Sequence, residues 1–183
     1  LSATPEEAEG ALRSLEENIA SMTAAFALAE DSSESERPML NGAFRDQLEG
    51  VFSEYFLIGE ALAADDAQAA SAAAEKTLKA IDSVDAELLE RKDMDKWDDF
   101  VEGLQTTLKP LKAKSDISRL RENFYLVSQQ MTAVARYFGS VTESPVFVLN
   151  CPMAFDNKGA LWLQGQKQTL NPLVEPAVLI LLF

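Results

Sequence analysis

The amino-acid sequence predicts a mainly α-helical protein: an up-and-down antiparallel bundle of four to five helices, followed by a short irregular or β-like C-terminal segment. Three observations predict this class. Alanine is abundant, whereas glycine and proline contribute only 8 and 7 of 183 residues, and alanine loses no side-chain entropy in a helix. Apolar residues recur at three- and four-residue steps, which is typical of amphipathic helices. The connections between these stretches are short, which favours antiparallel neighbours.

Composition and periodicity divide the chain into an N-terminal helix, a polar linker, the helical-bundle domain and a divergent apolar tail. Thr4 and Pro5 mark the start of the N-terminal helix, because threonine caps well and proline fits the first helical position. The serine-rich run that ends at Pro38 interrupts the apolar periodicity and indicates the linker. The four parts are predicted to span residues 1–30, 31–41, 42–172 and 173–183.

Four helices are predicted within the bundle domain, each with one apolar stripe. Asp65 is expected to cap the second helix, and Gly139 is expected to end the fourth. Beyond Gly139 the helical periodicity is lost, and residues 145–149 are β-like. The four helices are expected at about 43–63, from 66 to about 81, at about 96–112, and from Ser115 or Asp116 to Phe138.

The net charge of −14, from 30 acidic and 16 basic residues, excludes several classes of partner. Such a surface repels nucleic-acid phosphates and anionic lipid headgroups, so we expect no nucleic-acid or membrane-surface binding. An apolar run of about 18 residues is needed to span a bilayer, and the sequence has none, so we expect no membrane insertion. The chain begins at Leu1 rather than methionine, and we expect a fragment or an exported product whose signal peptide has been removed.

The sequence contains no histidine and one cysteine, which weighs against an enzyme. Histidine is the commonest general base and the commonest metal ligand. Catalysis would then need paired carboxylates or an activated thiolate, and the sequence shows neither pattern. We therefore expect no catalytic residues.

Cys151 and Met153 are the residues with the most distinctive chemistry. They lie two positions apart, so in an extended segment their sulfur atoms would point to the same side. A thiolate and a thioether form a soft donor set that suits Cu(I) or Ag(I). Cysteine and methionine are also ordinary core residues, so packing is the alternative interpretation. Residues 156–159 are expected to form a tight turn, with Gly159 in a left-handed conformation.

Two acidic groups are weaker candidates for a cation site. The pair Asp65 and Asp66 is most simply an acidic helix start, which the helix dipole favours. A second group precedes Phe100, and we interpret it as a helix N-terminus with a solvated face, because its spacing matches no known calcium loop. This second group consists of Asp93, Asp95, Asp98 and Asp99.

The C-terminal part of the bundle domain contains an ordered set of short motifs: Cys151-Pro152-Met153-Ala154, Asn157-Lys158-Gly159-Ala160, Trp162-Leu163 and Asn171-Pro172. Together these motifs resemble those of a known bacterial family, the domain of unknown function 3347. Residues Tyr55 to Asp66 and Asp116 to Ser128 are similar to two further stretches of that family, so the resemblance covers about Phe44 to Pro172. The family usually has a second cysteine after these motifs, and this chain lacks it.

The resemblance implies a helical bundle of the bacterial periplasm or cell envelope. Such domains occur free or fused to periplasmic adaptor subunits of heavy-metal efflux pumps of the resistance-nodulation-division class. The leading hypothesis is therefore a non-enzymatic domain that assists copper or silver efflux or binding, with Cys151 and Met153 as metal ligands and pump components as partners. The alternative is a structural or protein-interaction bundle without a metal role.

Overall fold

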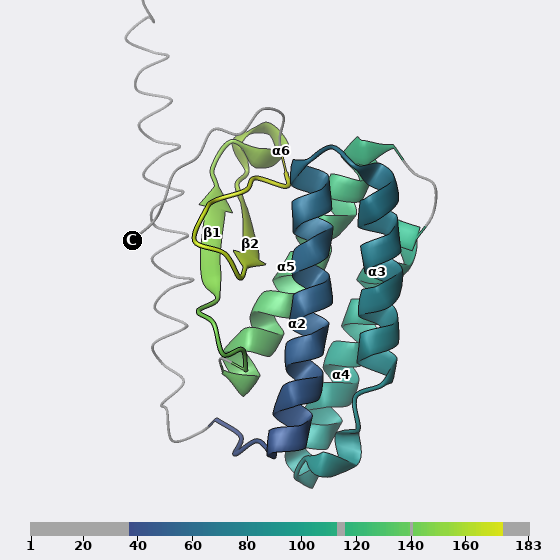
Figure 1. The fold of residues 1–183 in the computed structure, drawn as a ribbon, viewed down its shortest axis with the longest axis vertical. Helices are drawn as coiled ribbons and strands as arrows, with labels where there is room; N and C mark the ends of the chain where they lie inside the picture. Colours follow the sequence, from purple (N-terminus) through teal and green to yellow (C-terminus); the bar gives the residue numbers. More distant parts are fainter. Residues whose placement is uncertain (1–36, 113–115, 140, 174–183) are drawn as a thin grey trace, which may run out of the picture.

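The computed structural model describes residues 37–112, 116–139 and 141–173 (Figure 1). Within these residues the fold is mainly α-helical and carries one short antiparallel sheet, which confirms the predicted fold class. The predicted N-terminal helix, most of the predicted linker and the tail beyond residue 173 lie outside the described residues. The four long helices are α2 (Gly42–Ala63), α3 (Ala67–Asp82), α4 (Arg91–Leu108) and α5 (Ile117–Phe138).

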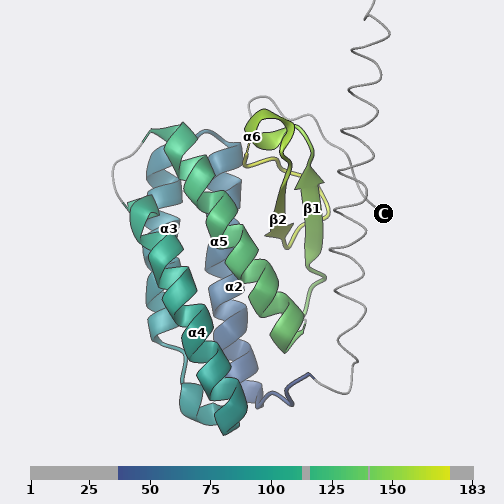
Figure 2. The ribbon, with the colours of Figure 1, turned by 180° about the vertical axis from the view of Figure 1, so that it is seen from behind.

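The four long helices form an up-and-down bundle. Each helix packs against the next one along the chain, and α5 returns to α2 to close the ring. Figure 2 shows α4 and α5 in front of α2 and α3. Single 3-10 turns at Ala86–Leu88 and Lys109–Lys112 lie on either side of α4. No helix in the described part of the chain combines the length and the apolar character needed to cross a membrane.

Side-chain caps fix where three of these helices begin. Asn41 accepts a hydrogen bond from the N–H of Ala43 at 2.8 Å, and Asp116 accepts one from Arg119 at 3.0 Å. The predicted cap of α3 by Asp65 is wrong, because Asp66 is the residue that accepts from the helix, at 2.8 Å from the N–H of Ala69. Asp65 instead has a φ of 58° and lies in the connection between α2 and α3.

Helix α4 begins at Arg91, five residues before the expected start at Lys96. The acidic group interpreted from the sequence as a helix start with a solvated face contains a buried residue, Asp93, which is 2% exposed. The hydroxyl of Tyr137 in α5 donates a hydrogen bond to Asp93 at 2.8 Å. This tertiary contact ties the first turn of α4 to α5, and a one-dimensional pattern does not reveal it.

Aromatic side chains fill the bundle core. Phe44 meets Trp97 edge-on at 5.6 Å between ring centroids, and Phe138 lies 5.4 Å from Phe44. Tyr55 and Phe124 stack at 5.3 Å with an interplanar angle of 13°. Such pairs contribute about 0.5–1.5 kcal/mol each beyond the burial of their area. Met131 is fully buried, as the apolar stripe of α5 predicts.

A β-hairpin follows the bundle and lies beside α2 and α5 (Figure 1). Strand β1 (Phe147–Cys151) pairs antiparallel with β2 (Ala160–Gln164), and the register runs from Phe147 opposite Gln164 to Cys151 opposite Ala160. The first strand confirms the β-like prediction, although it starts two residues later than expected. The second strand has no clear sequence signature, and β2 packs against α5 and α2.

Candidate functional site at the hairpin tip

Cys151 is the last residue of β1 and belongs to the buried core, with 1% of its surface exposed. Alternate residues of a strand face opposite sides. Leu149 is accordingly buried together with Cys151, whereas Val148, which precedes Leu149 and faces the opposite side, is 48% exposed. The fold therefore places the single cysteine of the sequence against the protein interior.

Met153 lies in the turn that follows β1 and is 54% exposed. The backbone at this residue is not extended, as a same-side arrangement of the two sulfur atoms would require: its φ and ψ are −88° and −8°, which is a helical conformation. Strand pairing ends at Cys151 opposite Ala160, so the chain has to turn at Pro152 and Met153 to form the hairpin. The thiol residue is consequently buried and the thioether residue exposed, and their role as metal ligands stays a prediction.

The hairpin tip, residues 152–159, contains the short helical turn α6 (Ala154–Asn157) and an unusual backbone. Phe155, Asp156 and Asn157 have φ values of 53°, 58° and 63°, and Gly159 has a φ of 76°. The left-handed Gly159 confirms the prediction. Left-handed backbone costs about 1–2 kcal/mol for most residues, although Asn and Asp tolerate it better.

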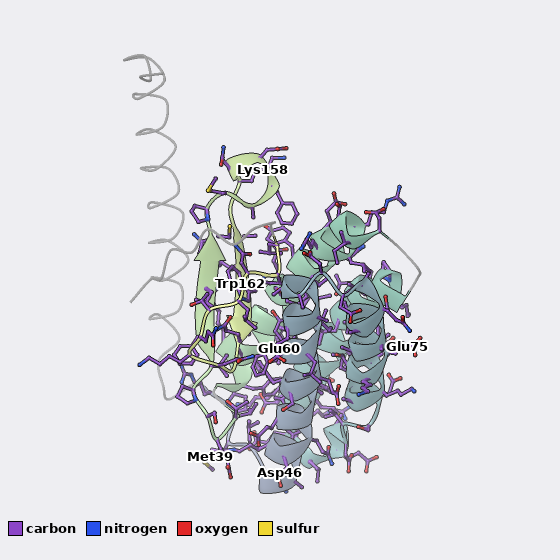
Figure 3. All side chains as sticks on the ribbon, turned by 45° about the horizontal axis from the view of Figure 1, so that its top comes forward. Met39, Asp46, Glu60, Glu75, Lys158 and Trp162 are labelled. Atoms are coloured by element: carbon purple, nitrogen blue, oxygen red, sulfur yellow. The ribbon has the colours of Figure 1, made fainter. Side chains whose placement is uncertain are left out.

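Packing and backbone hydrogen bonds hold this strained tip. The ring of Phe155 lies 5.2 Å from that of Tyr125 in α5 at an angle of 48°. The N–H of Gly159 donates to the carbonyl of Ala154 at 3.1 Å. Figure 3 shows Lys158 of the tip far from Met39 and Asp46. Strain of this kind persists where the surroundings over-determine the conformation, and it is often found at functional sites.

The two acidic groups have structural partners. Asp65 forms a salt bridge with Arg121 of α5, and Asp93 accepts from Tyr137. Burial, followed by the hydrogen bond and charge of Asp93, raises the pKa of Tyr137 to about 12. Among the residues that the structure describes, no three Cys, Asp or Glu side chains are grouped as metal ligands would be.

A buried polar network that the sequence did not reveal joins the hairpin to the bundle. The Tyr55 hydroxyl shares a hydrogen bond of 2.7 Å with Ser128 and accepts one from the N–H of Leu163 in β2 at 3.2 Å. Complete burial raises the pKa of Tyr55 well above its ordinary value, although both hydrogen bonds act in the opposite direction. The phenol therefore stays protonated and serves as a structural connector.

A small pocket separates α2 from the hairpin. Its volume of about 10 Å³ is room for about one water molecule. The walls combine apolar side chains with a few polar ones, so the pocket as folded suits water rather than an organic ligand. The lining residues are Phe56, Gly59, Glu60, Trp162, Leu163, Gln164, Gln166, Leu170 and Pro172.

These features define a four-helix-bundle domain with a β-hairpin packed beside α2 and α5. A family model described as "Protein of unknown function (DUF3347)" matches residues 51–143, just over half of the chain, and the chain belongs to that family. No curated protein matches the chain. No solved structure matches it either.

The family match includes some of the features described above and excludes others. Tyr55, Asp65 and Arg121 lie inside it, whereas Cys151 and Met153 lie beyond its end at residue 143. The resemblance seen in the sequence is thus confirmed at the level of the family. Its extension to residue 172 and the association with efflux adaptors stay predictions.

Proposed function

We propose that this chain is a non-enzymatic domain of the bacterial cell envelope that acts by contacting a partner protein through its hairpin. The observation that carries the proposal is the difference in solvent exposure between neighbouring residues of β1 and of the turn that follows it. Cys151 is 1% exposed, whereas Val148 and Met153 are 48% and 54% exposed. In this proposal the thiol of Cys151 is part of the packed core. The apolar side chains of Val148 and Met153 are the ones that the hairpin exposes to solvent.

The proposed partner is a periplasmic component of a heavy-metal efflux pump of the resistance-nodulation-division class, as the family resemblance suggests. Two features favour a protein-binding role. The tip is held in one conformation by Phe155 on Tyr125, so little ordering is required on binding. Methionine also adapts well to varied apolar surfaces.

A direct binding measurement tests this proposal. The full chain is titrated by calorimetry against a purified periplasmic adaptor subunit of a heavy-metal efflux pump. The same titration is made with Met153→Ser and Val148→Ser variants. We expect both substitutions to weaken binding about tenfold or more, because each removes an apolar contact. Met39→Ser is the matched control, since Met39 is 97% exposed and lies far from the tip (Figure 3). Equal affinity of all four proteins would contradict the proposal.

A transient contact with a soft metal ion is the second candidate function. The specific observation is the exposed thioether of Met153, two residues from the thiol of Cys151. Thioether and thiolate sulfur suit Cu(I) and Ag(I), but Cys151 becomes available only if the tip opens. In the folded arrangement these residues do not present a ready two-sulfur site, so any binding would involve Met153 first.

Metal affinity separates this second candidate from partner binding. Cu(I) is titrated against a competing chelator with the unmodified chain and with Cys151→Ser, Met153→Leu and Met39→Leu variants. A metal role predicts weaker Cu(I) binding in the first two variants and unchanged binding in the third. Unchanged affinity in all three variants would remove the metal role and leave the partner-binding proposal untouched.

A further inference from the structure

The segment after β2, residues 165–173, has no regular secondary structure and is referred to below as the C-terminal arm. Figure 1 shows the arm running from β2 back to the end of α2. The side-chain amide of Gln164 shapes its first part: Nε2 donates to the carbonyl of Gln168 at 2.9 Å, and Oε1 accepts from the N–H of Leu170 at 3.3 Å. Gln166 donates to the carboxylate of Glu60 in α2.

Arg121 fastens the far end of the arm. This side chain lies in α5 and is only 7% exposed. Its Nε donates to the carbonyl of Pro172 at 3.1 Å, and its Nη2 donates to the carbonyl of Leu62 at 3.2 Å and to the carboxylate of Asp65. One guanidinium group thus joins the arm, the end of α2 and the connection to α3. A buried charge is tolerated when it is paired and hydrogen-bonded.

The conformation of Asp65 points to a specific role for its carboxylate. The N–H of Asp66 donates to Ala61 at 2.9 Å and that of Asp65 to Leu62 at 3.2 Å, which is the Schellman pattern of a helix end. Asp65 occupies the left-handed position of this motif, with a φ of 58°. Glycine is the usual residue there because it has no Cβ. An aspartate at this position has a carboxylate, which glycine lacks, and this carboxylate forms the salt bridge with Arg121.

The arm covers an aromatic surface. Leu170 and Pro172 of the arm line the small pocket together with Trp162 of β2 and Phe56 of α2. Trp162 is 3% exposed. Displacement of the arm would therefore open the pocket and expose an apolar surface between the hairpin and α2, while the aromatic core between the helices keeps its own contacts.

We propose that Arg121 and Asp65 form a latch that holds the C-terminal arm closed. Loss of the ion pair releases residues 165–173 and exposes Trp162, and the four helices remain folded. The arm is thus a conformational device that controls an apolar surface. This inference depends on neither the proposed partner nor the metal.

Hydrogen exchange followed by mass spectrometry tests the latch in the full chain. Asp65→Asn removes the charge and keeps a residue that tolerates the left-handed conformation. Asp65→Gly removes the charge and also removes the steric cost of the left-handed backbone conformation. We expect arm amides such as Leu170 and Leu173 to exchange about tenfold faster or more in both variants, with α4 unchanged. Acrylamide quenching of tryptophan should rise in parallel, because Trp162 becomes accessible.

Asp116→Asn is the matched control, because Asp116 also pairs with an arginine, Arg119, at 3.5 Å on the exposed surface. In the Asp116→Asn variant, the amides of the C-terminal arm should exchange at the same rate as in the unmodified chain. Equal acceleration of the arm and of α4 in the Asp65 variants would overturn the proposal, since the pair would then support global stability only. An arm that stays protected in Asp65→Gly would also overturn it. The unmodified chain gives an independent test: arm amides must exchange faster than those of α4 and with a weaker urea dependence.

Discussion

Tyr55 in α2 and Leu163 in β2 are joined by a buried hydrogen bond of 3.2 Å, in which the backbone N–H of Leu163 donates to the phenolic oxygen. The Tyr55 hydroxyl in α2 thereby accepts the hydrogen bond that a backbone carbonyl of a third strand would otherwise accept from β2. A two-stranded hairpin is only marginally stable by itself in water. This contact, together with the packing of β2 on α5 and α2, explains why the hairpin is part of the domain.

Removal of the Tyr55 hydroxyl should therefore be costly. Tyr55→Phe leaves the N–H of Leu163 and the hydroxyl of Ser128 without this partner, and a buried unsatisfied group costs about 1–3 kcal/mol. We expect the free energy of unfolding, measured with urea, to fall by about that amount. Tyr125→Phe is the control, because its hydroxyl accepts an exposed hydrogen bond from Gln129 and should matter little. An equal fall in the free energy of unfolding in the two variants would show that the buried hydrogen bonds of Tyr55 contribute no more to stability than an exposed one.

The stability of the protein should fall at alkaline pH. The pKa of Tyr137 is raised to about 12 in the folded protein from an ordinary value of 10, and that of Tyr55 is raised further. The stabilisation from each neutral phenol is fully present below pH 10 and is lost as the pH rises through the folded pKa, because unfolding releases protons. Urea unfolding from pH 9 to 12 should show this decline. Tyr137→Phe should make the decline shallower, and an unchanged slope would contradict the assignment.

Two glycines of α2 should respond differently to alanine. A Cβ at Gly50 would meet no atom within 4 Å, whereas one at Gly59 would lie 3.2 Å from Cζ of Phe124. Alanine in a helix interior is favoured over glycine by about 0.5–1 kcal/mol. We expect Gly50→Ala to raise the midpoint of thermal unfolding. Gly59→Ala should not raise it, because Phe124 is stacked on Tyr55 and has little room to move. A rise in both variants would refute the predicted contact.

The hairpin tip should gain stability when its strain is relieved. Asp156 has a φ of 58° and is exposed, so Asp156→Gly should raise the free energy of unfolding by about 0.5–1 kcal/mol. The same substitution at Asp98, an exposed position within α4, should lower it by a few tenths of a kcal/mol, roughly the difference in helix propensity. Urea unfolding of the two variants measures both changes. Destabilisation by both substitutions would argue against strain at the tip.

The candidate site could be predicted only in part. The sequence indicated Cys151 and Met153 as chemically distinctive and Gly159 as left-handed. The burial of one sulfur-bearing residue and the exposure of the other depend on where strand pairing ends, and that point is set by Ala160, nine residues along the chain from Cys151. The pairing of Asp65 with Arg121 was equally hidden, although both residues lie in stretches that resemble the family.

The sequence by itself determined the helices of the bundle, because apolar spacing and capping residues act within a few residues of one another. Helix α2, the start of α5 after Asp116 and its end at Gly139 follow from such local rules. Only the tertiary structure decided the early start of α4, the second strand, and the partners of Tyr55, Asp65 and Asp93. Each of these depends on groups that are distant in sequence and become neighbours only when the helices pack. The physical reason is that burial removes water as a hydrogen-bonding partner, so a buried polar group must find its partner wherever the fold brings one within reach.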